Sequence, residues 1–138
     1  MENKIHFQYL IDGDDFTRAG EASSDIKNKL KMMNINPDAV RRVAIAMYEG
    51  EINMNADGGT IDVDVYPDKL TIVLKDTGPG IPDIDKAMEE GYSTAPDNIV
   101  SLGFGAGMGL PNMKRASDEM EISSVVGQGT TVTMTVLF

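Results

Sequence analysis

The stretch Gly103-Phe104-Gly105-Ala106-Gly107-Met108-Gly109-Leu110 carries four glycines at a strict two-residue spacing and leads into Pro111. Each glycine lacks a Cβ and weakens both helix and strand, so such a run suits a loop whose backbone N–H groups approach a negatively charged ligand. Residues 110–117 indicate a short helix with Pro111 in its first turn, where a missing N–H is harmless. The positive end of this helix would face the same ligand, and phosphate is the natural candidate.

Two familiar phosphate loops do not fit this spacing. A P-loop requires a Gly-Lys pair, and the chain contains none. A dinucleotide fingerprint opens the first βαβ unit with unequal glycine spacing, whereas this run has a period of two and lies late in the chain. A glycine loop without any ligand is the remaining alternative.

Size, composition and charge restrict the class of protein. The 138 residues predict a single domain spanning residues 1–138, without cysteines and without an apolar run of the roughly 20 residues that a membrane span needs. The net charge of −10 argues against nucleic-acid and anionic membrane partners and favours a bridging divalent cation wherever a polyphosphate binds. A soluble cytoplasmic protein is the expectation.

Hydrophobic periodicity predicts the order of the elements. Strands are expected at residues 5–11, 60–66, 70–75, 120–125 and 130–136 from their alternating apolar residues. Helices are expected from Phe16 to Met33, from Pro37 with Asn36 as its cap, at 84–90 and at 110–117, with residues 92–102 as a connection long enough for a lid. This order predicts an α/β (α+β) two-layer sandwich, in which helices cover one face of a mixed, mostly antiparallel sheet.

Acidic and amide side chains crowd the end of the second helix. Glu49, Glu51 and Asn53 lie where the helix dipole disfavours carboxylates. Glu49 and Asn53 are four residues apart and share a face, so they could present a base and a ligand for a hard cation to one site. The alternative is a solvated polar helix end.

A second acidic group follows the predicted strand 70–75. Asp76 stands at the strand end, and Gly78 and Gly80 follow it. This pattern fixes a carboxylate beside a backbone that is cleared for a flat ligand, with a simple Asx turn as the alternative. A further glycine turn, Gly127-Gln128-Gly129, precedes Thr130.

These four stretches together resemble the GHKL superfamily of ATPases, which share the histidine kinase-like (Bergerat) ATP-binding fold of histidine kinases, gyrase and Hsp90. Glu49 with Asn53 resembles the first motif of that superfamily, Asp76-x-Gly78-x-Gly80 the second, the run to Leu110 the third and Gly127-x-Gly129-Thr130 the fourth. The resemblance covers about residues 41–136. The short chain and the stretch 103–118 are most similar to bacterial anti-sigma regulatory factors, the serine/threonine protein kinases of partner-switching systems.

The resemblance implies ATP and Mg²⁺ as ligands. Asn53 would bind Mg²⁺, Glu49 would be the catalytic base, and Asp76 would accept a hydrogen bond from the adenine amino group with support from Thr130. The other expected ATP-binding residues are Gly78, Gly80, Gly105, Ala106, Gly107, Met108, Gly109 and Leu110.

The resemblance also implies protein partners. The phosphoryl acceptor would be a serine or threonine of an anti-anti-sigma antagonist protein, and a sigma factor would be a second partner. A homodimer is an open alternative for the assembly. Two other functions stay open: a nucleotide-gated binding module without phosphotransfer, and a detached histidine-kinase catalytic domain that needs a histidine-bearing partner.

Overall fold

The computed structural model describes residues 4–11, 20–54, 58–76, 109–125 and 127–138. The elements within them are β1 (Ile5–Ile11), α1 (Glu21–Met32), α2 (Pro37–Met54), β2 (Gly59–Val65), β3 (Lys69–Asp76), α5 (Gly109–Ala116), β4 (Glu119–Val125) and β5 (Gly129–Leu137). The expected helix 84–90, the connection 92–102 and residues 103–108 of the glycine run lie outside the described residues.

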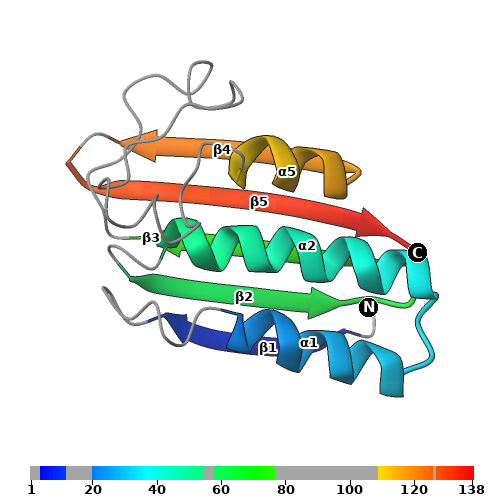
Figure 1. The fold of residues 1–138 in the computed structure, drawn as a ribbon. Coiled ribbons are helices and arrows are strands. Elements are labelled where there is room, and N and C mark those ends of the chain that lie inside the picture. The colour runs from blue at the N-terminus through cyan, green and yellow to red at the C-terminus, as the bar shows by residue number, and fades with distance from the viewer. Residues whose placement is uncertain (1–3, 12–19, 55–57, 77–108, 126) are drawn as a thin grey trace, which may run out of the picture.

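The five described strands form one sheet in the order β1-β2-β3-β5-β4, and every pairing among them is antiparallel. Strand β5, the last in the chain, lies between β3 and β4. Helices α1, α2 and α5 lie side by side on one face of this sheet, with α2 in the middle (Figure 1). The predicted two-layer sandwich with an antiparallel-rich sheet is therefore confirmed.

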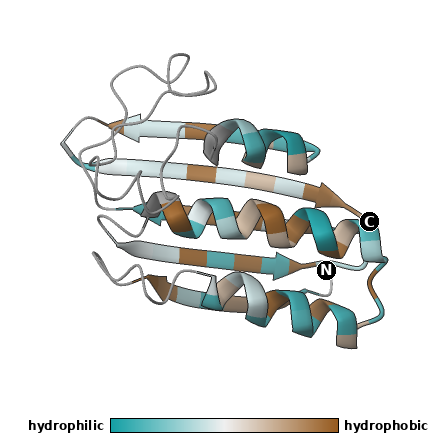
Figure 2. Ribbon diagram, viewed as in Figure 1, coloured by the Kyte–Doolittle hydropathy of each residue, from teal (hydrophilic) through white to brown (hydrophobic). Residues whose placement is uncertain are grey.

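Alternating side chains build the core between the two layers. In β2, β3 and β5 every second residue is buried under the helices, and brown and teal alternate along β2 in Figure 2. The helices contribute residues spaced three or four apart, so that each buries one face. The core includes Ile26, Leu30, Val43, Met47, Ile61, Val63, Leu70, Ile72, Met113, Val132, Met134 and Val136.

The ends of the second helix follow local sequence signals. The side-chain Oδ1 of Asn36 accepts a hydrogen bond from the Ala39 N–H at 2.8 Å, which confirms the predicted cap. The helix runs to Met54, and Gly58 then has φ of +81°, a left-handed conformation that favours glycine. The start predicted for the preceding helix, at Phe16, lies outside the described residues, which show α1 from Glu21.

Helix α1 is fastened to the edge strand β1 by polar contacts. The Tyr9 hydroxyl donates a hydrogen bond to Asp25 Oδ2 at 2.6 Å, and Lys29 forms an ion pair with the same carboxylate. Burial of the ring and the bond to Asp25 raise the pKa of Tyr9, while the bonds from Lys29 and Tyr9 lower the pKa of Asp25. These contacts hold α1 against β1.

The ends of four elements point to one side of the molecule. In Figure 1 the C-terminal end of α2, the end of β3 and the start of β5 lie at the left, and α5 begins at the end of its helix that faces the same side. Each belongs to one of the four stretches that the sequence singles out. Among the described helices, none is both long and apolar enough to cross a membrane.

Candidate functional site

Asp76 and Thr130 come together where β3 ends and β5 begins. The Thr130 backbone N–H donates a hydrogen bond to Asp76 Oδ1 at 3.0 Å, and Thr130 is only 6% exposed. The Thr130 hydroxyl lies 3.0 Å from the Ser124 hydroxyl of the neighbouring strand. A carboxylate held by a backbone donor is a fixed hydrogen-bond acceptor, which is the property that recognition of an amino group requires.

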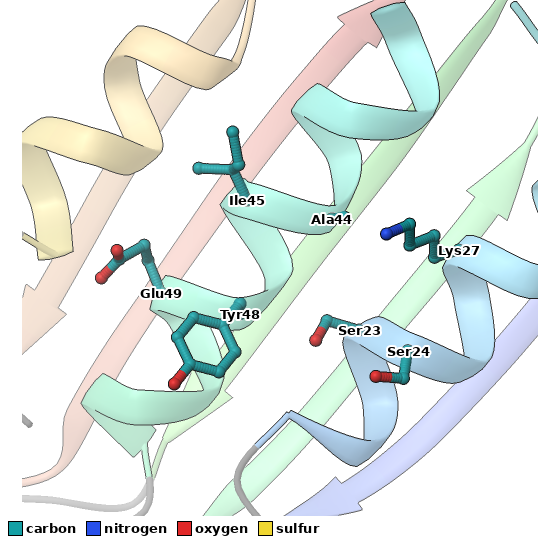
Figure 3. A pocket seen from close by; sticks show the side chains of 7 residues that line it. All are labelled: Ser23, Ser24, Lys27, Ala44, Ile45, Tyr48 and Glu49. Carbon is teal, nitrogen blue, oxygen red and sulfur yellow. The ribbon is translucent and has the colours of Figure 1, made fainter. Parts of the chain in front are cut away.

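Glu49 is the second carboxylate of the predicted site, and it projects from α2 toward the side on which α5 lies (Figure 3). Its Oε1 accepts a hydrogen bond from Asn112 Nδ2 of α5 at 3.1 Å. The Asn112 Oδ1 in turn accepts a hydrogen bond from Arg115 Nη2. The side chain of Glu49 on α2 is therefore hydrogen-bonded to α5 rather than extended into solvent.

An open hollow of about 290 Å³ borders Glu49. It lies between α1 and α2 on the outer face of the helical layer, and Figure 3 shows the side chains around it. Three lining residues come from α1 and four from α2: Ser23, Ser24, Lys27, Ala44, Ile45, Tyr48 and Glu49. Glu49 lines one edge of this hollow, while its carboxylate points away from α1 and toward α5 (Figure 3).

Asn53 lies in the last turn of α2, one turn beyond Glu49. Its side chain is outside the described part of the structure, so its role as a Mg²⁺ ligand stays a prediction. Gly109 and Leu110 form the start of α5, which begins one residue before the predicted start at Leu110. The other expected ATP-binding residues, Gly78, Gly80, Gly105, Ala106, Gly107 and Met108, lie outside the described residues.

Glu51 explains part of the acidic crowding at the end of α2. This carboxylate is 1% exposed and accepts backbone hydrogen bonds from the first residues of α1. The donors are the N–H groups of Gly20 at 2.8 Å, Ala22 at 3.3 Å and Ser23 at 2.6 Å. The negative charge therefore neutralises the positive end of α1, where the first backbone donors lack helical partners.

Gly50 brings the end of α2 directly onto β3. A Cβ at this position would lie 2.3 Å from Cδ2 of Leu74, a separation that real Cβ atoms do not show. Leu74 is two residues before Asp76, and Gly50 is three residues before Asn53. The absence of a side chain at Gly50 thus lets the helix turn that carries Asn53 approach the strand that ends at Asp76.

The sequence alone did not identify Asn112 or Gly50 as site residues. In the sequence Asn112 is only one residue of a predicted helix start. Its partner Glu49 is 63 residues away, so no local pattern indicates the contact. The approach of Gly50 to Leu74 depends on which strand lies beneath α2, which no local pattern specifies. A glycine in the middle of an amphipathic helix is nevertheless a usable signal of close packing.

Comparison with known proteins places the chain among nucleotide-binding proteins. The family described as histidine kinase-, DNA gyrase B- and HSP90-like ATPase matches residues 36–138. Similar proteins include the serine/threonine-protein kinase RsbT of Bacillus subtilis (strain 168), which is 40% identical over 93 residues, 64% of this chain and 64% of that protein. The alignment therefore spans slightly less than two thirds of that kinase.

Two proteins named anti-sigma F factor align over more of this chain. The one from Caldanaerobacter subterraneus subsp. tengcongensis is 34% identical over 115 residues, 83% of this chain and 70% of that protein. The one from Clostridium acetobutylicum is 31% identical over 144 residues, 97% of this chain and 93% of that protein. Since the family match takes in α2 and all the elements that follow it, this chain belongs to the family of histidine kinase-, DNA gyrase B- and HSP90-like ATPases.

Proposed function

We propose that this chain is an ATP- and Mg²⁺-dependent protein serine/threonine kinase that acts as an anti-sigma regulatory factor. The names of its relatives, a serine/threonine-protein kinase and two anti-sigma F factors, support this proposal. The observation that carries it is the placement of Glu49, which lines an open hollow and whose carboxylate is oriented by a hydrogen bond from Asn112. A base in this position would accept the proton of a hydroxyl from a second protein.

The adenine of ATP would bind at Asp76. With Oδ1 held by the Thr130 N–H, the carboxylate is a fixed acceptor that fits an exocyclic amino group. A purine that presents a carbonyl at the same place would leave this acceptor unpaired, so GTP should bind weaker than ATP by a factor on the order of 10⁴. Gly78 and Gly80 would allow the flat base to approach the backbone.

The phosphates would bind near the start of α5. The N-terminal end of this helix carries a partial positive charge that suits an anion. Residues 105–110 would lie along the phosphates. The amide oxygen of Asn53 is the type of hard ligand that Mg²⁺ prefers, and the ion would neutralise phosphate charge during transfer.

Glu49 would then act as the catalytic base. Its carboxylate would accept the proton of the attacking serine or threonine hydroxyl as the new bond to the γ-phosphorus forms. The bond from the γ-phosphorus to the bridging oxygen breaks, and ADP leaves with that oxygen. Asp76 would keep the nucleotide oriented during the step, while Glu49 keeps the proton.

The acceptor would be an anti-anti-sigma antagonist protein, and a sigma factor would be the other partner. The sigma factor follows from the name anti-sigma F factor, and the antagonist follows from the resemblance to the kinases of partner-switching systems. A sigma factor as partner places the reaction in the cytoplasm. The proposal also includes a homodimer. Light scattering, which measures the oligomeric state in solution, tests this point.

A transfer assay distinguishes the functions that the sequence leaves open. The chain is incubated with γ-³²P-labelled ATP, Mg²⁺ and candidate antagonist proteins from its own cell. Acid-stable label on a serine or threonine of one candidate supports the kinase. Acid-labile label on a histidine would instead indicate a detached histidine-kinase domain, and ATP-dependent binding of a partner without any label would indicate a binding module.

A further inference from the structure

Asn112 makes a contact that joins the two helices of the site. It lies in α5, three residues after Gly109, the residue at which this helix begins. Its Nδ2 is 3.1 Å from Glu49 Oε1, and the contact is partly shielded from solvent. This side chain is not among the residues expected to bind the nucleotide or to act as the base.

The orientation of the Asn112 amide is set by its two partners. A guanidinium group has donors and no acceptor, so the Arg115 contact must be made to Oδ1. The amide nitrogen then faces Glu49, where an ionised carboxylate offers only acceptors. Reversal of the amide would break both hydrogen bonds, so Arg115 fixes the donor toward Glu49.

The packing of α5 makes this contact persistent. On either side of Asn112, the residues Pro111, Met113 and Ala116 are buried, and α5 packs against α2. A rotation of α5 that removed Asn112 from Glu49 would expose this apolar surface, at a cost that scales with the area exposed. The orientation of the Glu49 side chain on α2 therefore depends on the position of α5.

We propose that Asn112 is a positioning residue for phosphoryl transfer, which holds the Glu49 carboxylate in the orientation that receives the acceptor proton. This inference rests on the proposed function. The hydrogen bond occupies Oε1, and Oε2 would take the hydroxyl proton. Because Asn112 lies one turn after Gly109, the helix that borders the phosphates would also set the position of the base.

Kinetics of two variants test the inference. Asn112→Ala removes the donor, and kcat for transfer to the antagonist protein should fall about 10- to 100-fold, since a misplaced catalytic group costs up to about 10² in rate. Asn112→Asp has the same shape but turns an acceptor toward Glu49, so kcat should fall by about 100-fold or more. KM for ATP should change less than about twofold in both variants, because neither change touches the nucleotide.

A purely structural role for Asn112 predicts the opposite order. The isosteric Asn112→Asp would then be closer to wild type than Asn112→Ala, and kcat and KM would change together. Asn28→Ala, the same substitution at an exposed position of α1, is the matched control and should leave both parameters unchanged. A double-mutant cycle should show that Asn112→Ala has little further effect in a Glu49→Ala background.

A measurement without turnover completes the test. The side-chain amide resonances of Asn112 in ¹⁵N-labelled protein should shift in Glu49→Ala, while those of Asn28 stay in place. Unshifted resonances, or wild-type kcat in both Asn112 variants while Glu49→Ala is inactive, would overturn the inference alone. Full transfer by Glu49→Ala, or none by wild type, would instead overturn the proposed function and the inference with it.

Discussion

Two carboxylates at one end of the molecule are each held by a donor from a different element. Asp76 on β3 is held by the Thr130 N–H of β5, and Glu49 on α2 is held by the Asn112 amide of α5. In both cases one oxygen of the carboxylate is engaged by a fixed donor, which orients the group without supplying a proton. This arrangement suits one acceptor for an adenine amino group and one acceptor for a hydroxyl proton.

Replacement of Asp76 by asparagine tests its role as the acceptor for the adenine amino group. The asparagine Oδ1 can still accept from the Thr130 N–H, so the far-UV circular dichroism spectrum and the melting temperature should stay close to wild type. The new NH₂ group would oppose the adenine amino group, donor against donor. The loss of about 1–3 kcal/mol for each unsatisfied group predicts that Kd for Mg·ATP rises about 100-fold or more in Asp76→Asn.

Isothermal titration calorimetry with Mg·ATP measures this change. Asp68→Asn, at an exposed turn between β2 and β3, is the matched control and should bind ATP like wild type. An unchanged Kd in Asp76→Asn would remove Asp76 as the adenine acceptor.

Replacement of Glu49 by glutamine tests the base. The Gln side chain keeps an oxygen that can accept the Asn112 bond, so ATP affinity should change less than about twofold. It cannot accept the hydroxyl proton, so kcat for transfer should fall about 10²- to 10⁴-fold. Single-turnover transfer of labelled phosphate measures the effect, and Glu121→Gln on the exposed face of β4 is the control. Transfer at the wild-type rate would exclude Glu49 as the base.

At the scale of elements, Glu51 couples the last turns of α2 to the first turn of α1. Its two oxygens accept three backbone hydrogen bonds from residues 20–23. In Glu51→Gln, an NH₂ group would replace one oxygen and face backbone donors. The free energy of unfolding should therefore fall by about 1–3 kcal/mol, the cost of buried polar groups that lose their partners.

Urea denaturation followed by circular dichroism checks this expectation. Glu121→Gln makes the same chemical change at an exposed position and should shift the free energy of unfolding by no more than about 0.5 kcal/mol. If the two variants were equally stable, the hydrogen bonds of Glu51 would contribute nothing to the joining of α1 and α2.

The elements that the sequence predicted are those with local signals. Strands β2, β3 and β5 alternate because each buries one face, and α2 begins where Asn36 caps it. The sequence also marked the carboxylate of Glu51 as unusual, but its partners in α1 lie 28 to 31 residues away. The contacts of Gly50 and Asn112 depend in the same way on which elements pack together, and the periodicity of the sequence does not predict that packing.

At the scale of the whole molecule, the candidate site and a polar cluster around Arg42 and Asp118 lie at opposite ends. Arg42, in the first half of α2, donates to Asp118 Oδ2 at 2.8 Å and to the Leu137 carbonyl at 2.9 Å. The Leu137 N–H donates to the same Asp118 oxygen at 2.7 Å. This cluster joins α2 to the start of β4 and the end of β5, at the right in Figure 1. Its loss should therefore affect stability without affecting the site.

The Asp118 cluster predicts a pH-dependent contribution to stability. The bonds from the Leu137 N–H and from Arg42 lower the pKa of Asp118 in the folded state. In the unfolded chain the group returns to its usual pKa of about 3.9. Between the two pKa values the unfolded chain binds more protons, so stability increases with pH through this window. The contribution is complete above about pH 4 and is lost as the pH falls through the folded-state pKa.

Asp118→Asn isolates this contribution because asparagine does not titrate. Near neutral pH the variant should be less stable than wild type by at most about 1 kcal/mol, since the Asp118 side chain is 35% exposed and its ion pair is screened by solvent. The difference should shrink when urea denaturation is repeated below about pH 4. Mg·ATP affinity near neutral pH should match wild type, because the cluster is remote from Asp76 and Glu49. A stability difference that stayed constant with pH would show that the Asp118 charge is not what stabilises this end, and a weakened ATP affinity would show that the two ends of α2 are coupled.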